Sequence, residues 1–234
     1  MKRSLILLTF NEIEALPRIF DRIPLRSADE VLAIDGGSTD GTIDFLKSKN
    51  LRVVVQERRG RGVAFRLGAR EAAGEKLVFF SPDGNEDPAD IPRLFSVLGQ
   101  GYDMAIASRM MPGAVNEEDI HWLRLRKWVN KSFGMAANLL WNRGPYITDT
   151  INGYRGVTKR AMELMATDED GFPIEYQMSI RAMKLGLTVR EIPTHEGQRL
   201  GGASTAESFP TGMRFARRLC SEIRVGRSFI PAAR

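Results

Sequence analysis

Short apolar runs alternate with segments of helical periodicity along the first half of the chain, and this alternation restricts the fold more than any other feature. Apolar runs of this length are typical of buried strands, and the spacing between them is that of amphipathic helices. Strand–helix–strand units in series place their strands parallel in one sheet, with the helices on its faces. We therefore predict an α/β fold with a mostly parallel, doubly wound sheet. The strands are expected at residues 4–9, 31–34, 53–55, 77–80, 104–107 and 188–192, and the helices cover or include 12–23, 43–46, 64–72, 121–141 and 174–185.

Composition favours a soluble globular protein with anionic partners. Of the 234 residues, 43% are hydrophobic and 27% charged. The single cysteine, Cys220, excludes an internal disulfide and a cysteine-based zinc cluster. A formal net charge of +5 favours phosphates, nucleotides or an acidic lipid surface. The basic residues are not accompanied by a helix-turn-helix, RNA-recognition or zinc-finger pattern, so we expect no nucleic-acid binding.

The sequence contains no stretch typical of a targeting or membrane-spanning segment. The apolar run at residues 5–8 is too short for a signal-peptide core, and Asn11 and Glu12 interrupt it. No stretch approaches the roughly 18 apolar residues that a transmembrane helix needs. We expect a cytoplasmic protein.

A cluster of oxygen-bearing side chains follows the fourth expected strand. Pro82 and Gly84 turn the chain there, at the edge of the sheet where open α/β folds bind ligands. Asp83, Asn85 and Asp87 alternate, so in an extended segment their side chains would point the same way and could hold one Mg²⁺ or Mn²⁺. The alternative is a solvated acidic turn in which Asp87 caps the next helix.

The glycine-rich turn at residues 35–42, after the second strand, is another candidate ligand contact. It has neither the G-x-G-x-x-G of dinucleotide-binding folds nor the lysine of a P-loop. Asp35 ends the strand, and the two glycines after it would let the backbone approach a ligand closely. A plain tight turn into a helix capped by Ser38 or Asp40 is the alternative.

Together these motifs resemble family 2 glycosyltransferases of the GT-A fold, especially the dolichyl-phosphate mannose synthases and related polyprenyl-phosphate glycosyltransferases. The resemblance rests on Asn11-Glu12 after the first strand, the 35–42 turn and the acidic cluster, in that order and spacing. It implies a nucleotide-sugar donor of the GDP-mannose or UDP-glucose type, Mg²⁺ or Mn²⁺, a polyprenyl- or dolichyl-phosphate acceptor and inverting transfer. Transfer to a hydroxyl of a glycan or small molecule is the alternative.

On the donor side, the resemblance implies nucleoside contacts from Asn11, Glu12 and Asp35. Gly62, in an Arg61-Gly62 turn, looks like a further part of the nucleotide pocket.

The acidic cluster occupies the position of the family's metal motif and departs from it in one residue. Asp83 is expected to bind both the metal and the nucleotide sugar, but Asn85 stands where the family has a second carboxylate. The loss of one negative charge should weaken binding of the bare metal. Either Asp87 compensates, or the metal arrives mainly with the diphosphate.

On the acceptor side, Arg109 and Arg126 look like contacts to the acceptor's phosphate, with Arg124 as the rival of Arg126. Residues 147–155 resemble the family's D-x-x-S-G-F-R segment, which places Asp149 near the reacting centre. Asp149 would be the general base toward a hydroxyl acceptor, whereas a phosphate acceptor is already anionic and needs no base.

Residues 195–204 resemble the family's glycine-rich R-x-x-G-x-S loop. The resemblance implies a flap that orders over the donor diphosphate, with Arg199 neutralising the departing group. An ordinary surface loop is the alternative.

Two basic helical segments complete the prediction. In the 121–141 helix, Val129, Phe133 and Leu140 belong to an apolar stripe that either packs on the core or lies on an anionic membrane surface. We predict a catalytic domain at residues 1–208 and a basic helical extension at 209–234. The extension could serve peripheral membrane contact or oligomer contact.

Overall fold

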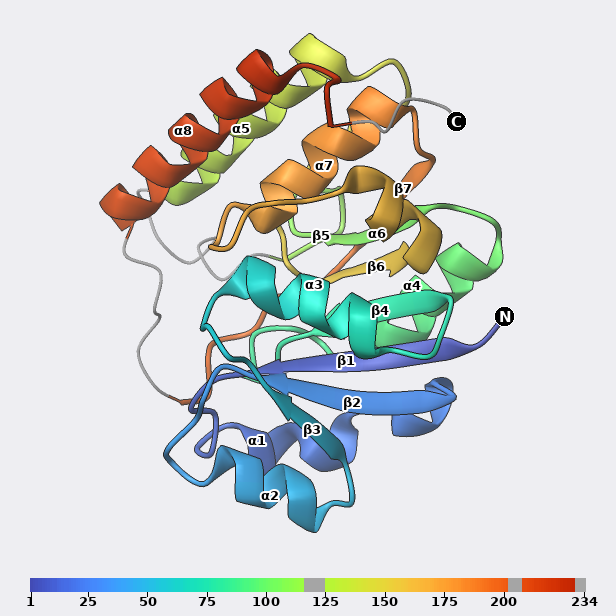
Figure 1. Ribbon diagram of the computed structural model, residues 1–234, viewed down its shortest axis with the longest axis vertical. Coiled ribbons are helices and arrows are strands. Elements are labelled where there is room, and N and C mark those ends of the chain that lie inside the picture. The colour runs from blue at the N-terminus through green and yellow to red at the C-terminus, as the bar shows by residue number, and fades with distance from the viewer. Residues whose placement is uncertain (116–124, 202–207, 230–234) are drawn as a thin grey trace.

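The computed structural model describes residues 1–115, 125–201 and 208–229, with the backbone alone described at 125–127 and 208–211. Within these residues, seven strands form one sheet in the order β3-β2-β1-β4-β6-β5-β7 (Figure 1). The strands are β1 (Arg3–Thr9), β2 (Glu30–Asp35), β3 (Arg52–Val55), β4 (Lys76–Phe80), β5 (Met104–Ser108), β6 (Arg155–Thr158) and β7 (Val189–Pro193). The helices are α1 (Leu16–Ile19), α2 (Thr42–Ser48), α3 (Arg61–Glu71), α4 (Asp90–Gly99), α5 (Leu125–Trp141), α6 (Lys159–Met165), α7 (Ile174–Leu185) and α8 (Ser208–Val225).

Strands β1 to β4 form a parallel half-sheet, as the alternation of strands and helices predicts. The side chains of Leu5, Ile6 and Leu7 are fully buried because helices cover both faces. Ile6 faces α3, where Phe65 stacks on Phe79 with ring centroids 4.3 Å apart. Leu5 and Leu7 belong to the core on the opposite face. The carboxyl ends of β1, β2 and β4 consequently meet at one edge.

β6 departs from the predicted parallel order, because it pairs antiparallel with both β4 and β5. The sequence pattern does not predict β6 or the following α6. Four residues that include a glycine and a fully buried arginine carry no apolar alternation. Arg155 is accommodated because its guanidinium donates to the carbonyl oxygens of Asn152 and Glu175, both at 2.9 Å.

The long helix expected at residues 12–23 is wrong. The helix α1 spans only Leu16–Ile19, and 3-10 turns follow at Phe20–Arg22 and Leu25–Ser27. Pro17 explains the late start, because proline cannot donate a helical hydrogen bond and is tolerated only in the first turn. The apolar spacing still directs Ile19 and Phe20 into the core.

The helices α5, α7 and α8 pack together at one end of the molecule, where α5 and α8 lie side by side (Figure 1). Phe133, Tyr176 and Phe215, one from each helix, form an aromatic cluster with centroid distances of 5.7 Å. Glu222 of α8 is fully buried. The expected boundary between residues 208 and 209 falls in the first turn of α8, which contributes to the common core.

The predicted apolar stripe of α5 is only partly correct. Phe133 packs against the core, but Val129 and Leu140 are exposed, because the inward line follows residues 133, 137 and 141. Trp122, which the predicted stripe also includes, and Arg124 lie outside the described residues. None of the described helices combines the length and apolar composition needed to cross a bilayer.

Candidate functional site

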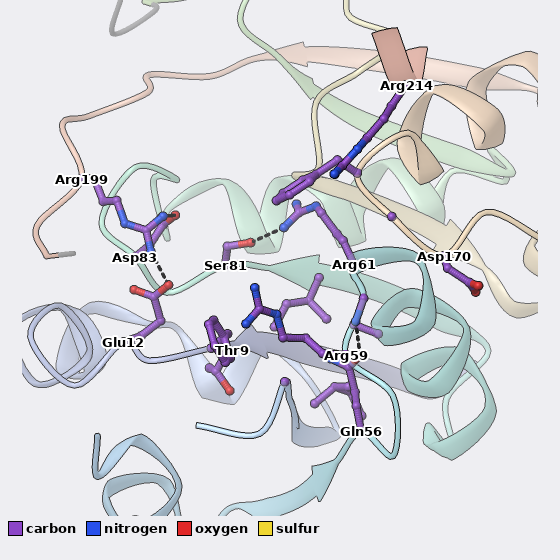
Figure 2. A pocket seen from close by; sticks show the side chains of 18 residues that line it. Thr9, Glu12, Gln56, Arg59, Arg61, Ser81, Asp83, Asp170, Arg199 and Arg214 are labelled. Carbon is purple, nitrogen blue, oxygen red and sulfur yellow. Dashed lines mark hydrogen bonds and ion pairs between the residues drawn. The ribbon is translucent and has the colours of Figure 1, made fainter. Parts of the chain in front are cut away.

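A cavity of about 550 Å³ opens at the carboxyl ends of the parallel strands (Figure 2). Its walls come from the loops after β1, β2, β3 and β4, the loop before α7, the segment after β7, and α8. Glu12, Asp83 and Arg199 lie at one end in this view, and Arg61 and Arg214 at the other. Residues far apart in sequence thus form one polar, mixed-charge cavity where open α/β sheets bind ligands.

Asp35 organises the wall between β1 and β2. Its buried carboxylate accepts hydrogen bonds from Thr9 Oγ1 at 2.8 Å, from Ser38 N and Oγ at 2.7 Å, and from Gly37 N at 2.9 Å. Asn11 fixes the same turn, because its Oδ1 accepts from Thr39 N at 3.0 Å. The cavity surface here comes from neighbouring residues such as Gly36. The nucleoside contacts of Asn11 and Asp35 stay predictions, and neither residue is among those that line the cavity.

Phe10, Gln56 and Arg59 line the cavity and were not singled out by the sequence analysis. The Arg59 guanidinium lies 4.0 Å from the centroid of the Phe10 ring, a cation–π arrangement. The Gln56 side chain accepts from Gly60 N at 3.0 Å and so fixes the turn into α3. An aromatic residue just after the first strand and the basic run at 58–61 are the signals that could have marked this corner.

Arg61 and Gly62 occupy the amino end of α3. Arg61 pairs with the buried carboxylate of Glu175 and lies 3.5 Å from Ser81 Oγ. Gly62 N donates to Asp170 O at 2.9 Å, and a Cβ at Gly62 would lie 1.9 Å from Glu169 O. Gly62 is therefore a close-packing position that lets the loop before α7 form the cavity wall.

Glu12, Asp83 and Arg199 form a cluster that we call the loop cluster. Arg199 Nη2 donates to Glu12 Oε1 at 2.5 Å, and Nη1 lies 3.3 Å from Asp83 Oδ2. The segment that carries Arg199 follows β7 and is attached by Leu200 N donating to Asp83 O at 2.9 Å and Gly197 N donating to Asn85 O at 2.8 Å. Burial raises the pKa of Glu12 to about 7, although Arg199 opposes the shift.

The extended geometry expected for the acidic cluster is wrong, although the ligand assignment itself stays a prediction. Residues 82–85 form a turn, with Gly84 at a φ of 95°. Asp83 Oδ1 accepts from Asn85 N at 3.0 Å, whereas Asp87 Oδ1 accepts from Ala89 N at 3.1 Å just before α4. Only Asp83 of the three lines the cavity. Across residues 1–115, 125–201 and 208–229, no group of three His, Cys, Asp or Glu side chains is placed to hold a metal ion.

The fit to a divalent metal therefore depends on the loop cluster. Two hard carboxylates, Glu12 and Asp83, face one cavity, and Glu12 Oε2 is buried without a hydrogen-bond partner among the described residues. Such a pair suits Mg²⁺ or Mn²⁺ when phosphate oxygens and water complete the octahedron. Glu86, missed in the sequence, supports the turn because its Oε2 accepts from Ser81 N at 2.7 Å. Burial, followed by the charge of Asp83, raises its pKa well above the usual range.

Arg109, Asp149 and Glu196 form a second cluster, which we call the inner cluster. Arg109 binds Asp149 in a bidentate manner, with Nε donating to Oδ2 at 2.8 Å and Nη2 to Oδ1 at 3.1 Å. Its Nη1 lies 3.4 Å from Glu196 Oε1. Burial alone would raise the pKa of Asp149, but the charge and hydrogen bonds of Arg109 hold it below its ordinary value. The predicted residues Arg109 and Asp149 are thus brought together. Arg126 lies in α5, and its side chain is outside the described part of the structure.

Comparison with known proteins agrees with this architecture. The model of the family described as Glycosyl transferase family 2 matches residues 4–162, more than half of the chain. Glycosyltransferase AglJ of Haloferax volcanii is 30% identical over 201 residues, which are 84% of this chain and 63% of the relative. Undecaprenyl-phosphate mannosyltransferase of Micrococcus luteus is 30% identical over 209 residues, which are 82% of each chain. The chain spans less than two thirds of the length of AglJ.

A solved structure has the same fold. Glucosyl-3-phosphoglycerate synthase from Mycobacterium tuberculosis, in complex with Mn²⁺, UDP-glucose and phosphoglyceric acid, superposes with a TM-score of 0.73 at 20% identity. The superposition covers 99% of this chain and 81% of that chain. The sheet, the cavity at its carboxyl edge and these matches define a protein with the GT-A fold of glycosyltransferases. The chain belongs to glycosyl transferase family 2.

Proposed function

We propose that the chain transfers a sugar from a nucleoside-diphosphate sugar of the GDP-mannose or UDP-glucose type to a polyprenyl or dolichyl phosphate, with inversion at the anomeric carbon. The loop cluster carries the proposal. Glu12 and Asp83 face a cavity at the carboxyl edge of the sheet, and Arg199 reaches them from a segment almost 190 residues further along the chain than Glu12. The named activity of the relative from Micrococcus luteus supports the acceptor class.

Asp83, and Glu12 once it is released from Arg199, would hold the divalent ion, and Asn85 and Asp87 remain proposed as further ligands. When bound, Mg²⁺ or Mn²⁺ supplies charge neutralisation to the diphosphate leaving group. The positively charged guanidinium of Arg199 lies against both carboxylates, so their position suits a cation.

Arg199 would exchange partners when the donor binds. It contacts Glu12 and Asp83 at the cavity, which supports a position beside the proposed diphosphate site. A guanidinium released from two carboxylates can donate to phosphate oxygens in the same fork geometry. Arg199 would then stabilise the negative charge that develops as the nucleoside diphosphate leaves.

The acceptor would approach from the side of the inner cluster. We propose that Arg109 and Arg126 guide its phosphate, whose oxygen attacks the anomeric carbon from the face opposite the leaving group. A phosphate is anionic at neutral pH, so this attack requires no general base. Asp149 has a lowered pKa and accepts three hydrogen bonds from Arg109, so it acts by positioning Arg109.

We also propose a cytoplasmic location with peripheral contact to a membrane, where a polyprenyl phosphate would be presented. The α5 side chains of Trp128, Met135 and Leu139 are 68%, 61% and 85% exposed. Lys131 lies 5.6 Å from the ring centroid of Trp128, which combines an apolar surface with positive charge. Such helices lie in the headgroup region of anionic bilayers.

A transfer assay tests the function. UDP-, GDP- and dTDP-sugars are offered with and without polyprenyl phosphate in anionic vesicles, in Mg²⁺, Mn²⁺ or EDTA. We expect a glycosyl polyprenyl phosphate from one donor, formed only with metal and lost in the variant Asp83→Asn. Transfer to glycan or small-molecule hydroxyls that is abolished by Asp149→Asn would refute the phosphate acceptor.

A further inference from the structure

The helix α8 carries three ionisable side chains at intervals of four residues, Arg214, Arg218 and Glu222, and therefore on one face. Glu222 is fully buried, where it accepts from Lys184 Nζ at 2.7 Å and from Arg181 Nε at 3.1 Å. These interactions fix the middle of α8 against α7. The same face continues, one and two turns earlier, at Arg218 and Arg214.

Arg218 attaches this face of α8 to the cavity wall. Its Nη2 and Nε donate to Glu169 Oε2 at 2.6 and 2.8 Å. Glu169 lies in the loop before α7, and the next residues of that loop, Asp170 and Phe172, line the cavity. The position of α8 is consequently fixed relative to the cavity.

Arg214 lies one turn before Arg218 and lines the same cavity, at the end opposite Arg199 (Figure 2). In the part of the chain that the structure describes, no carboxylate pairs with its exposed side chain. The other three lining arginines are engaged within the protein, Arg61 with Glu175, Arg199 with the loop cluster and Arg59 with the face of the Phe10 ring. Partial burial of an unpaired guanidinium at a cavity costs free energy, and an anion that binds there offsets this cost.

We propose that Arg214 is a phosphate-binding residue of this cavity, so that α8 takes part in substrate binding. The assignment rests on the proposed function, which supplies two sources of phosphate oxygens, the donor's diphosphate and the acceptor's phosphate. The fork of donors on the guanidinium suits either source. The segment after β7 and the helix α8 would then each supply one arginine to the cavity, Arg199 and Arg214, at its two ends.

Arg217 provides a matched control. It lies on the same helix and is exposed, but it is not among the residues that line the cavity. Arg214→Gln and Arg217→Gln remove the same charge from α8, so a general electrostatic effect would change both variants alike. Arg214→Lys keeps the charge without the fork, and equal melting temperatures establish that all three variants fold.

Binding of GDP and UDP, each with Mn²⁺, and of a polyprenyl phosphate in detergent is measured by calorimetry. We expect Arg214→Gln to lower the affinity for one of these ligands about tenfold. Arg214→Lys should lower that affinity less, and Arg217→Gln should leave it unchanged. Weaker nucleotide binding assigns Arg214 to the donor, and weaker polyprenyl-phosphate binding assigns it to the acceptor. Unchanged affinities in Arg214→Gln, or equal losses in Arg217→Gln, would overturn the assignment. If the wild-type chain binds none of the three ligands, the proposed function itself fails.

Discussion

The loop cluster and the inner cluster both place an arginine against two carboxylates, yet their surroundings differ. Arg109 and Asp149 have 14% and 1% of their side chains exposed and meet in a bidentate pair. Arg199 is 24% exposed and makes one short contact and one of 3.3 Å. Both clusters depend on the segment after β7, which supplies Glu196 to one and Arg199 to the other.

The two clusters also shift carboxylate pKa values in opposite directions. Asp149 is buried but fully engaged by a cation, and its pKa is lowered. Glu12 is buried with only one of its oxygens bound by Arg199, and its pKa is raised to about 7. Burial favours the neutral acid unless hydrogen bonds and opposite charge outweigh it. We therefore expect the inner cluster to be a fixed frame, and the proposed function requires the loop cluster to exchange the guanidinium of Arg199 for substrate and metal.

The largest expected difference is in stability. Asp149→Ala leaves Arg109 buried with Glu196 as its nearest carboxylate at 3.4 Å, and we expect a loss of about 3 kcal/mol in the free energy of unfolding. Asp83→Ala should cost less than about 1 kcal/mol, because Arg199 can be hydrated. Urea unfolding of both variants measures this difference. Equal losses would contradict the distinction between a fixed and an exchangeable cluster.

The sequence predicts the parallel half of the sheet well because its signals are local. Apolar runs and glycine turns locate β1, β2 and β4, and α7 has the predicted bounds, residues 174–185. β6 is missed because Arg155–Thr158 becomes a strand only through its pairing with β4 and β5. The helix expected at 12–23 is shortened because the apolar spacing that predicted it gives no weight to Pro17.

The site follows the same division. Asp83 and Arg199, which line the cavity, could be singled out from sequence because each stands at a recognisable turn or loop, and their roles stay predictions. The position of Arg214 depends on how α8 packs against α7, which no local pattern encodes. The acidic cluster was expected to be extended from alternation alone, but the positive φ of Gly84 makes it a turn.

An intermediate effect is expected in catalysis. Arg199→Gln removes the charge that would stabilise the leaving diphosphate, so kcat should fall about 10- to 100-fold, equivalent to about 1.4–2.7 kcal/mol. The same change leaves Glu12 and Asp83 without a cation, so bare Mn²⁺ should bind more tightly. Steady-state kinetics and Mn²⁺ titration by electron paramagnetic resonance check the two results.

Arg190→Gln is the matched control for that experiment, because Arg190 of β7 lies against the Tyr102 ring and is not among the residues that line the cavity. An equal fall of kcat in Arg190→Gln would show that the loss is not specific to Arg199. Weaker Mn²⁺ binding in Arg199→Gln would show that Arg199 does not compete with the metal for Glu12 and Asp83.

Per pH unit, the smallest expected effect is the pH dependence of stability. The pKa of Glu12 is about 7 in the folded protein against 4.5 for the ordinary group, so the folded state binds more protons between these values. The free energy of unfolding should therefore fall as pH rises through this window, by at most about 1.4 kcal/mol per pH unit, and level off above it. Asp149 changes stability in the opposite direction. Because its pKa is lowered, it stabilises the fold at pH values above its ordinary pKa, and this stability is lost on acidification. Urea unfolding from about pH 5 to about pH 8 isolates the Glu12 contribution, because this range lies above the ordinary Asp149 pKa of 3.8 and Glu12→Gln removes the remaining slope. A difference between wild type and Glu12→Gln that grows with pH would mean that Arg199 already outweighs burial at Glu12, and the two clusters would then behave alike.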